Sequence, residues 1–391
     1  MSNLRLSGKD ELLAAFDEAR AATLGVATVL DDTQWRPPYH PGVQPVAWDL
    51  LHIGWFAEFW LLRGPHRLDL DGTVRAARHE RITGPDEQLD SARIGHRARW
   101  DLPLPDREGV FDRLQRQLLA CKNRVAGGQG NDRDLYHARF AVFHEFVHHE
   151  AMVSMCDLLS LPAPAGMGMR VFADAPPLTI AAGEHEIGRH PDELGFAFDN
   201  EMPSRGVELA AFSIDHAPVS NARFLEFVRA DGYQRAEFWP GPAGVWLQKA
   251  ERQAPERWRR LKNGDYAQRW FSEWRPLPLA EPVVHVNAFE AEAFCRFAGR
   301  RLPHAAEWEA AAPRLAWGQS VWEWTVDPFA PYPGFRPGPD TTYSTPWFHN
   351  HRELRGGAFA THRLLHDRRY RNFYLPQRTD VFGGFRTAGD A

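Results

Sequence analysis

The chain has 391 residues, with 46 basic and 51 acidic side chains and a formal net charge of −5. This length predicts two domains, and the acidic balance without a long basic run gives no indication of a nucleic-acid partner. Because no stretch has the apolar length of a membrane span or of a signal peptide, we expect a cytoplasmic protein that acts without nucleic acid or membrane.

The first part of the chain contains four predicted helices, in which apolar residues recur at helical spacing. They are expected near residues 8–30, 46–62, 107–126 and 133–160. Pro45 suits the first turn of the second helix. A long irregular excursion, residues 63–106, separates the second helix from the third. Four helices of this length predict a four-helix bundle.

Two histidines of the fourth helix are four residues apart. His144 and His148 stand in an apolar, helix-periodic segment, and on a helix this spacing points both imidazoles the same way. Two neutral imidazoles form half of a first-row metal site, and bundles supply the remaining ligands from a facing helix. His52, in the second predicted helix, is the candidate third ligand.

The same segment also satisfies the zinc-hydrolase pattern H-E-x-x-H, in which Glu145 is the general base. The extended metzincin pattern requires a glycine and a third histidine, where this chain has Ala151 and Ser154. A downstream glutamate ligand of the thermolysin kind stays open at this point. A metal-free module that binds its ligand without turnover is a further alternative.

A proline- and glycine-rich segment, residues 162–177, interrupts the helical pattern. After it, short β-like runs replace long helices, and the main exceptions are residues 221–231 and 289–299. We therefore predict a helical domain at 1–161, a linker at 162–177 and an α+β domain at 178–391.

Ordered motifs in both halves make the chain similar to a known enzyme family. Residues 48–58 and 144–150 resemble the DinB-like bundle of the non-haem iron sulfoxide synthases of ergothioneine biosynthesis. The second half resembles their formylglycine-generating-enzyme-like domain, which has a C-type-lectin-like fold. Its matching motifs are residues 180–188, 198–203, 218–224, 282–287, 294–303, 307–309, 321–325, 354–358 and 383–386. The resemblance implies an α+β chain in which a DinB-like four-helix bundle precedes a C-type-lectin-like domain.

The resemblance also implies a cofactor and two kinds of substrate. His52, His144 and His148 are expected to bind Fe(II) and to leave positions for O2 and for a sulfur or selenium donor. The enzyme then joins that donor to C2 of the hercynine imidazole. Glu150 is expected to orient a ligand or a water molecule beside the metal.

A C-terminal motif, Tyr370-Arg-Asn-Phe-Tyr374, falls where members of this family contact the substrate. The resemblance implies that Asn372 donates to the hercynine carboxylate and that Phe373 offers an aromatic face to its trimethylammonium group. Packing inside the lectin-like domain is the alternative for both residues. A tyrosine is the expected proton donor, with Tyr374 as the first candidate and Tyr332 as the second.

The nature of the donor depends on the excursion after the second helix. The thiol-using branch of the family has an arginine-rich segment there and an acidic residue in place of Tyr374. In this chain, residues 91–96 and 99–105 are more similar to the selenoneine synthases, which couple hercynine to a selenosugar. We therefore predict a selenoneine synthase. The alternative is an ergothioneine sulfoxide synthase using cysteine or γ-glutamylcysteine, with carboxylate contacts from Arg75, Arg78, Arg81, Arg97 and Arg99.

Formylglycine generation itself is not expected. Enzymes with that activity need a reactive cysteine pair near the C-terminus, and Cys295 is the only cysteine in the second half of this sequence. Together with Cys121 and Cys156, it also gives too few cysteines for a disulfide framework or a zinc ribbon. We expect each cysteine to be buried as a small apolar side chain.

Overall fold

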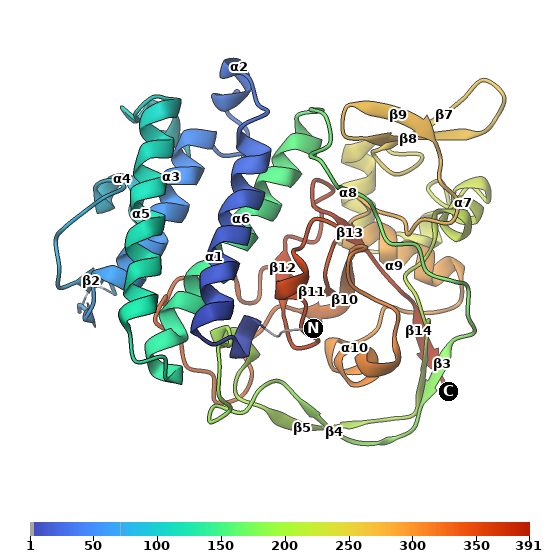
Figure 1. The fold of residues 1–391 in the computed structure, drawn as a ribbon. Coiled ribbons are helices and arrows are strands. Elements are labelled where there is room, and N and C mark those ends of the chain that lie inside the picture. Colours follow the sequence, from blue (N-terminus) through green and yellow to red (C-terminus); the bar gives the residue numbers. More distant parts are fainter. Residues whose placement is uncertain (1–3, 71) are drawn as a thin grey trace. The chain divides into compact units, whose positions relative to one another are not determined.

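The computed structural model describes residues 4–70 and 72–391, which form two units (Figure 1). The first unit runs to Cys156 and also includes Asp192–Ala197 and Pro339–Thr342. The second unit comprises Asp157–Pro191, Phe198–Gly338 and Tyr343–Ala391. Two short segments from the second half of the sequence therefore fold with the first unit.

The first unit contains the four predicted long helices. They are α1 (Lys9–Ala27), α3 (Val46–Ala57), α5 (Arg107–Gly127) and α6 (Asp132–Leu158), drawn from blue to green in Figure 1. The shorter elements are η1 (Leu4–Leu6), α2 (Asp32–Trp35), η2 (Glu58–Leu62), β1 (His66–Leu68), β2 (Val74–Ala76), α4 (Asp86–Leu89) and η3 (His96–Asp101). Within the described ranges, no helix combines the length and the apolar character needed to cross a bilayer.

A buried arginine connects three of the long helices. Arg20 of α1 donates to both carboxylate oxygens of Glu145 in α6, at 2.8 and 3.3 Å. Its other hydrogen bonds reach the Leu114 carbonyl and the Gln117 side chain of α5, at 2.8 and 3.0 Å. Arg20 is 5% exposed and Glu145 is 2% exposed. Such a pair is tolerated in a core because its polar atoms bond one another.

A glycine allows close contact between α3 and its neighbours. A methyl group added at Gly54 would lie 2.8 Å from side-chain carbons of both Leu114 and Thr83. We expect Gly54→Ala to lower the free energy of unfolding by about 1–3 kcal/mol, because overpacking outweighs the better helix propensity of alanine. Gly25→Ala in α1 is the matched control. No atom lies within 4 Å of its added methyl group, and we expect a gain of about 0.5–1 kcal/mol. Urea denaturation measures both, and equal stability changes at the two positions would contradict this packing argument.

The second unit contains the two helices expected from periodicity and two that were not predicted. The expected helices are α7 (Asn221–Arg229) and α9 (Ala288–Phe297). The others are α8 (Pro242–Ala250), which begins with a proline, and α10 (Ala305–Ala311), which begins with a capping box of His304 and Glu307. α8 buries Ala243 alone and so has no apolar face, and the seven residues of α10 are too few to show a period. Only these start signals marked the two helices. The 3-10 helices are η4 (Asp199–Glu201), η5 (Ala236–Phe238), η6 (Ala312–Arg314), η7 (Thr345–Trp347) and η8 (Arg363–Leu365).

Short strands complete the second unit. They are β3 (Leu178–Ile180), β4 (Gly183–Ile187), β5 (Arg205–Leu209), β6 (Phe212–Ile214), β7 (Trp258–Arg260), β8 (Tyr266–Trp270), β9 (Glu273–Pro276), β10 (Trp322–Pro328), β11 (Arg352–Gly356), β12 (Asn372–Tyr374), β13 (Gly383–Gly384) and β14 (Ala388–Asp390). One sheet has the order β12-β11-β10-β13, in which only the β10–β13 pair is parallel. A second has the order β14-β6-β3, with Leu178 and Ala388 both paired to Ile214. The hairpin β4-β5 and the sheet β7-β8-β9 are separate. The first and last strands of this unit thus flank β6, and the predicted α+β class is confirmed.

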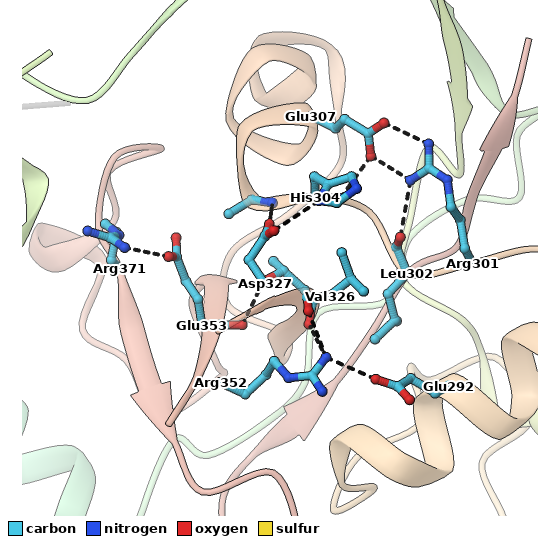
Figure 2. A network of polar contacts seen from close by, with 12 residues as sticks. Glu292, Arg301, Leu302, His304, Glu307, Val326, Asp327, Arg352, Glu353 and Arg371 are labelled. Atoms are coloured by element: carbon cyan, nitrogen blue, oxygen red, sulfur yellow. Dashed lines mark hydrogen bonds and ion pairs between the residues drawn. The ribbon is translucent and has the colours of Figure 1, made fainter. Parts of the chain in front are cut away.

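A polar network, buried at its Arg371–Glu353 pair, reaches the start of β12 (Figure 2). Arg371, which precedes β12, forms a 2.6 Å ion pair with Glu353 of β11, and both side chains are at most 2% exposed. Burial alone would raise the pKa of Glu353, but the guanidinium groups of Arg371 and Arg355 hold it below its usual value. Further along the network, His304 and the backbone N–H of Ala305 bond Asp327. The Arg371–Glu353 pair lies beside the paired strands β11 and β12, in which Asn372, Phe373 and Tyr374 are opposite Leu354, Glu353 and Arg352.

Candidate metal centre and its cavity

The three predicted ligand histidines come together in the first unit. His52 lies on α3, and His144 and His148 lie on α6; one ring nitrogen from each falls within 4.8 Å of the others. The ring centroids are 5.0 Å apart for His52 and His144, 4.9 Å for His52 and His148, and 4.4 Å for the pair on α6. Facing helices thus present a three-histidine group that can hold one metal ion.

Hydrogen bonds orient two of these rings. His52 donates from Nδ1 to the Leu89 carbonyl at 2.7 Å, and His148 donates from Nδ1 to Asp49 Oδ1 at 2.8 Å. Each bond leaves Nε2 for a metal ion, and such partners fix the orientation of ligand rings and raise their basicity. His144 is held by stacking on Phe56, with 3.6 Å between ring centroids. Its Nδ1 is buried without a hydrogen bond.

The environment keeps the imidazoles of His52 and His144 neutral. Burial lowers the pKa of His52 and of His144 well below the usual value, and the neighbouring His148 lowers both further. A metal binds neutral imidazole and not the protonated ring, so the donors fit a divalent ion. The polarity, burial and spacing of the group therefore agree with the metal site that the sequence predicts.

The excursion after α3 supports this group through α4. Arg63 donates to both carboxylate oxygens of Asp86 at 2.7 and 2.9 Å, and Trp55 donates to the same carboxylate at 2.9 Å. Burial alone would raise the pKa of Asp86, but these donors hold it at about 2. The Arg63–Asp86 pair anchors the first residue of α4. The carbonyl of the last residue of this helix, Leu89, accepts from His52. A segment without helical periodicity thus positions one metal ligand.

Asp49, which accepts from His148, is a candidate positioning residue that was not predicted from the sequence. Its only signal was its place three residues before His52 in the same helix. We expect Asp49→Asn to weaken Fe(II) binding about 10- to 100-fold, because the amide is a weaker acceptor for the His148 ring. Anaerobic Fe(II) titration measures this, with Asp112→Asn as the control, since Asp112 forms an exposed pair with Arg116. Unchanged affinity in the Asp49 variant would contradict the assigned role.

The position of Glu145 opposes the zinc-hydrolase alternative. In that mechanism the glutamate activates a metal-bound water. Here both carboxylate oxygens of Glu145 accept from Arg20 inside the bundle. Glu150, predicted to act beside the metal, is also on α6 and is 8% exposed. Its role stays a prediction.

A cavity of about 270 Å³ opens beside His52 and His144. One side is aromatic, formed by Trp55, Phe56, Phe59 and Trp60. The other side is polar, formed mainly by Thr73, Asp90, Ser91, Arg93, Asp340, Thr341 and Thr342. Arg93 is paired with Asp90 at 3.0 Å. The cavity therefore offers hydroxyl groups and carboxylates, and its arginine is already neutralised.

The five arginines considered as carboxylate contacts are engaged elsewhere. Within the part of the chain that the structure describes, none of the five lines the cavity. Arg75 bonds Asp69, Arg78 the Leu62 carbonyl and Arg81 Asp86, whereas Arg97 lies over Tyr39 and Arg99 over Trp48.

The remaining predicted residues belong to the second unit. The Asn372 side chain accepts from the backbone N–H of Phe373 at 2.8 Å, and the Phe373 ring stacks on Phe329 with 4.2 Å between centroids. The Arg378 guanidinium lies 5.0 Å from the centre of the Tyr374 ring. Tyr332 is 5% exposed and its hydroxyl accepts from Arg355 at 3.1 Å. Burial raises the pKa of Tyr332. Their roles in substrate binding and proton transfer stay predictions.

None of the three cysteines forms a disulfide in the described part of the chain, and all three are buried, as expected. Burial raises the pKa of the Cys295 thiol far above its usual value. A buried, protonated thiol is a poor nucleophile. Cys295 therefore has the packing role that the sequence predicted.

Comparison with known proteins identifies the family. Residues 15–152 match the DinB superfamily, and residues 173–320 match the sulfatase-modifying factor enzyme 1-like domain. The hercynine oxygenase of Mycolicibacterium thermoresistibile is 30% identical, with 100% of this chain and 97% of that protein aligned. That of Mycolicibacterium smegmatis is 28% identical over 95% of this chain and 97% of its own length. The formylglycine-generating enzyme of Streptomyces coelicolor is 33% identical over 42% of this chain and 58% of its own length. The chain belongs to the hercynine oxygenase family, with an N-terminal helical DinB domain followed by a C-type-lectin-like α+β domain.

Proposed function

We propose that the chain is a non-haem iron enzyme that uses O2 to join hercynine to a chalcogen donor, with a selenosugar as the preferred donor. In the balanced reaction, hercynine, a selenol and O2 give the C2-linked selenoxide and water. The three-histidine group and the relationship to hercynine oxygenases support the general activity. Fe(II) at His52, His144 and His148 would supply positions for O2 and for the donor atom.

The side chains around this group have separate tasks in the proposal. Asp49 and the Leu89 carbonyl hold the ligand rings, and Glu150 orients a ligand or water. The aromatic side of the cavity excludes water and keeps the reacting groups close together. Asn372 donates to the hercynine carboxylate and Phe373 faces its trimethylammonium group. Tyr374, or Tyr332 as the second candidate, delivers the proton.

The polar side of the cavity is the observation that favours a sugar donor. Four hydroxyl side chains and the carboxylates of Asp90 and Asp340 match the hydroxyl groups of a sugar, which donate and accept hydrogen bonds. A peptide thiol such as γ-glutamylcysteine needs cationic partners for its carboxylates, normally arginine. In this cavity Arg93 is paired with Asp90. The charge pattern thus favours a neutral, polyhydroxylated donor.

A competition experiment tests this choice. Equal concentrations of a 1-selenosugar, its 1-thiosugar analogue, cysteine and γ-glutamylcysteine are supplied with limiting hercynine, and the products are quantified by mass spectrometry. γ-Glutamylcysteine would lack two charge-assisted contacts to its carboxylates, which corresponds to a product ratio of roughly a hundredfold against this peptide thiol. We expect the selenosugar product to dominate, and the thiosugar to react ahead of γ-glutamylcysteine. Predominant sulfoxide from γ-glutamylcysteine would place the enzyme in the ergothioneine branch.

A further inference from the structure

The aromatic side of the cavity depends on an irregular turn. Helix α3 does not stop at Ala57 but continues as the π-helix η2 (Glu58–Leu62), which supplies Phe59 and Trp60 to the cavity. A π turn holds an additional residue compared with an α turn, so it redirects the side chains that follow, and such turns occur often at functional sites.

Two histidines bond the carbonyl groups of this turn. The helix ends at Leu62, so the carbonyls of its last residues have no later helical N–H as a partner. His66 of β1 donates from Nε2 to the Phe59 carbonyl at 2.7 Å, and His137 of α6 donates from Nδ1 to the Trp60 carbonyl at 3.1 Å. Because a carbonyl only accepts, each bond also fixes the tautomer of its ring.

The same histidines pack against the aromatic residues they fix. The His66 ring lies 4.7 Å from that of Trp60 and 5.0 Å from that of Phe59, and the His137 ring lies 5.6 Å from that of Trp60. The two imidazoles stack at 5.7 Å. Burial lowers the pKa of both rings, that of His137 to about 4. Both are therefore neutral near pH 7, which avoids two stacked cations.

The turn has open space behind it. A second cavity, of about 470 Å³, has Trp60, His66 and His137 in its lining. Trp60 therefore lines both this space and the cavity beside His52 and His144. The ends of the turn have other partners: Glu58 accepts from the backbone N–H groups of Ile82 and Thr83, and the Leu62 carbonyl accepts from Arg78. Between these ends, the two imidazoles bond the carbonyls of Phe59 and Trp60.

We infer that His66 and His137 are positioning residues that hold Phe59 and Trp60 as the aromatic side of the cavity beside His52 and His144. They thereby set the affinity for the substrate that occupies it. This inference rests on the proposed function, in which the donor fills that cavity. Neither histidine is one of the three metal-binding residues.

Paired substitutions test the inference on the full-length, iron-loaded enzyme. His66→Phe keeps an aromatic ring but removes the donor, whereas His66→Gln keeps an N–H donor near the position of Nε2. His137→Ala and His137→Asn form the corresponding pair for Nδ1. His79→Ala, at an exposed histidine of the same excursion, is the control. For each variant we measure four quantities: hydrogen exchange of residues 58–66, iron content, kcat, and KM for the 1-selenosugar.

We expect His66→Phe and His137→Ala to exchange faster over residues 58–66 and to raise KM about fivefold each, the size of one lost neutral hydrogen bond. Iron content and kcat should change little, and His66→Gln and His137→Asn should recover much of the KM. Unchanged exchange and KM in folded, iron-loaded His66→Phe and His137→Ala would overturn the inference. The same KM increase in His79→Ala would also overturn it. Failure of the wild-type enzyme to convert hercynine would instead refute the proposed function, whereas hydrogen exchange would still report on the turn.

Discussion

Replacing any one of His52, His144 or His148 with alanine is expected to abolish iron retention and hercynine turnover. The three rings form one group with candidate ligand nitrogens within 4.8 Å of one another, and two remaining ligands hold a divalent ion weakly. Iron content after anaerobic loading and desalting measures the loss, and circular dichroism establishes that each variant is folded.

The matched control is His149→Ala. His149 is the next residue on α6 and is 7% exposed, so its removal perturbs the same helix. Successive residues of a helix point about 100° apart, which directs His149 away from the ligand group. We expect this variant to keep its iron. Loss of iron in His149→Ala together with retention in His148→Ala would show that the ligand assignment is wrong.

Glu145→Gln is expected to lower the free energy of unfolding by about 3–5 kcal/mol, because it leaves the buried Arg20 charge without its carboxylate partner. Urea denaturation measures this change. The folded variant should nevertheless bind iron and convert hercynine at a rate near that of the wild type, since Glu145 has a structural role. Glu108→Gln, at an exposed position of α5, is the control and should change stability by no more than about 0.5 kcal/mol.

The same variant separates the two metal mechanisms. If Glu145 were the general base of a zinc hydrolase, Glu145→Gln would remove turnover while the metal stayed bound. Loss of turnover at full metal content and normal stability would therefore contradict the role assigned here. A strong loss of stability with activity retained would agree with the buried ion pair.

The features with a regular period or a fixed spacing could be predicted from the sequence. The long helices α1, α3, α5 and α6 follow from the apolar residues that each of them buries in the bundle. The spacing of His144 and His148 predicted that their rings would meet, which the structure confirms. The position of His52 in a facing helix completed the group.

The features that depend on tertiary contacts could not be predicted in this way. Asp49 reaches His148 across 99 positions of sequence, and Arg20 reaches Glu145 across 125. Residues 339–342 join the first unit although they follow most of the second in sequence. No local pattern marks such contacts, because they arise from how distant segments pack. Helix α8 was missed because it buries Ala243 alone and has no apolar face, and α10 because seven residues are too few to define a period.

Metal analysis of the anaerobically purified protein, with O2 uptake recorded on addition of hercynine and donor, tests the central claim most directly. We expect each chain to bind one iron ion and O2 uptake to require both substrates. Bound zinc, or a protein that binds hercynine without metal and consumes no O2, would contradict it.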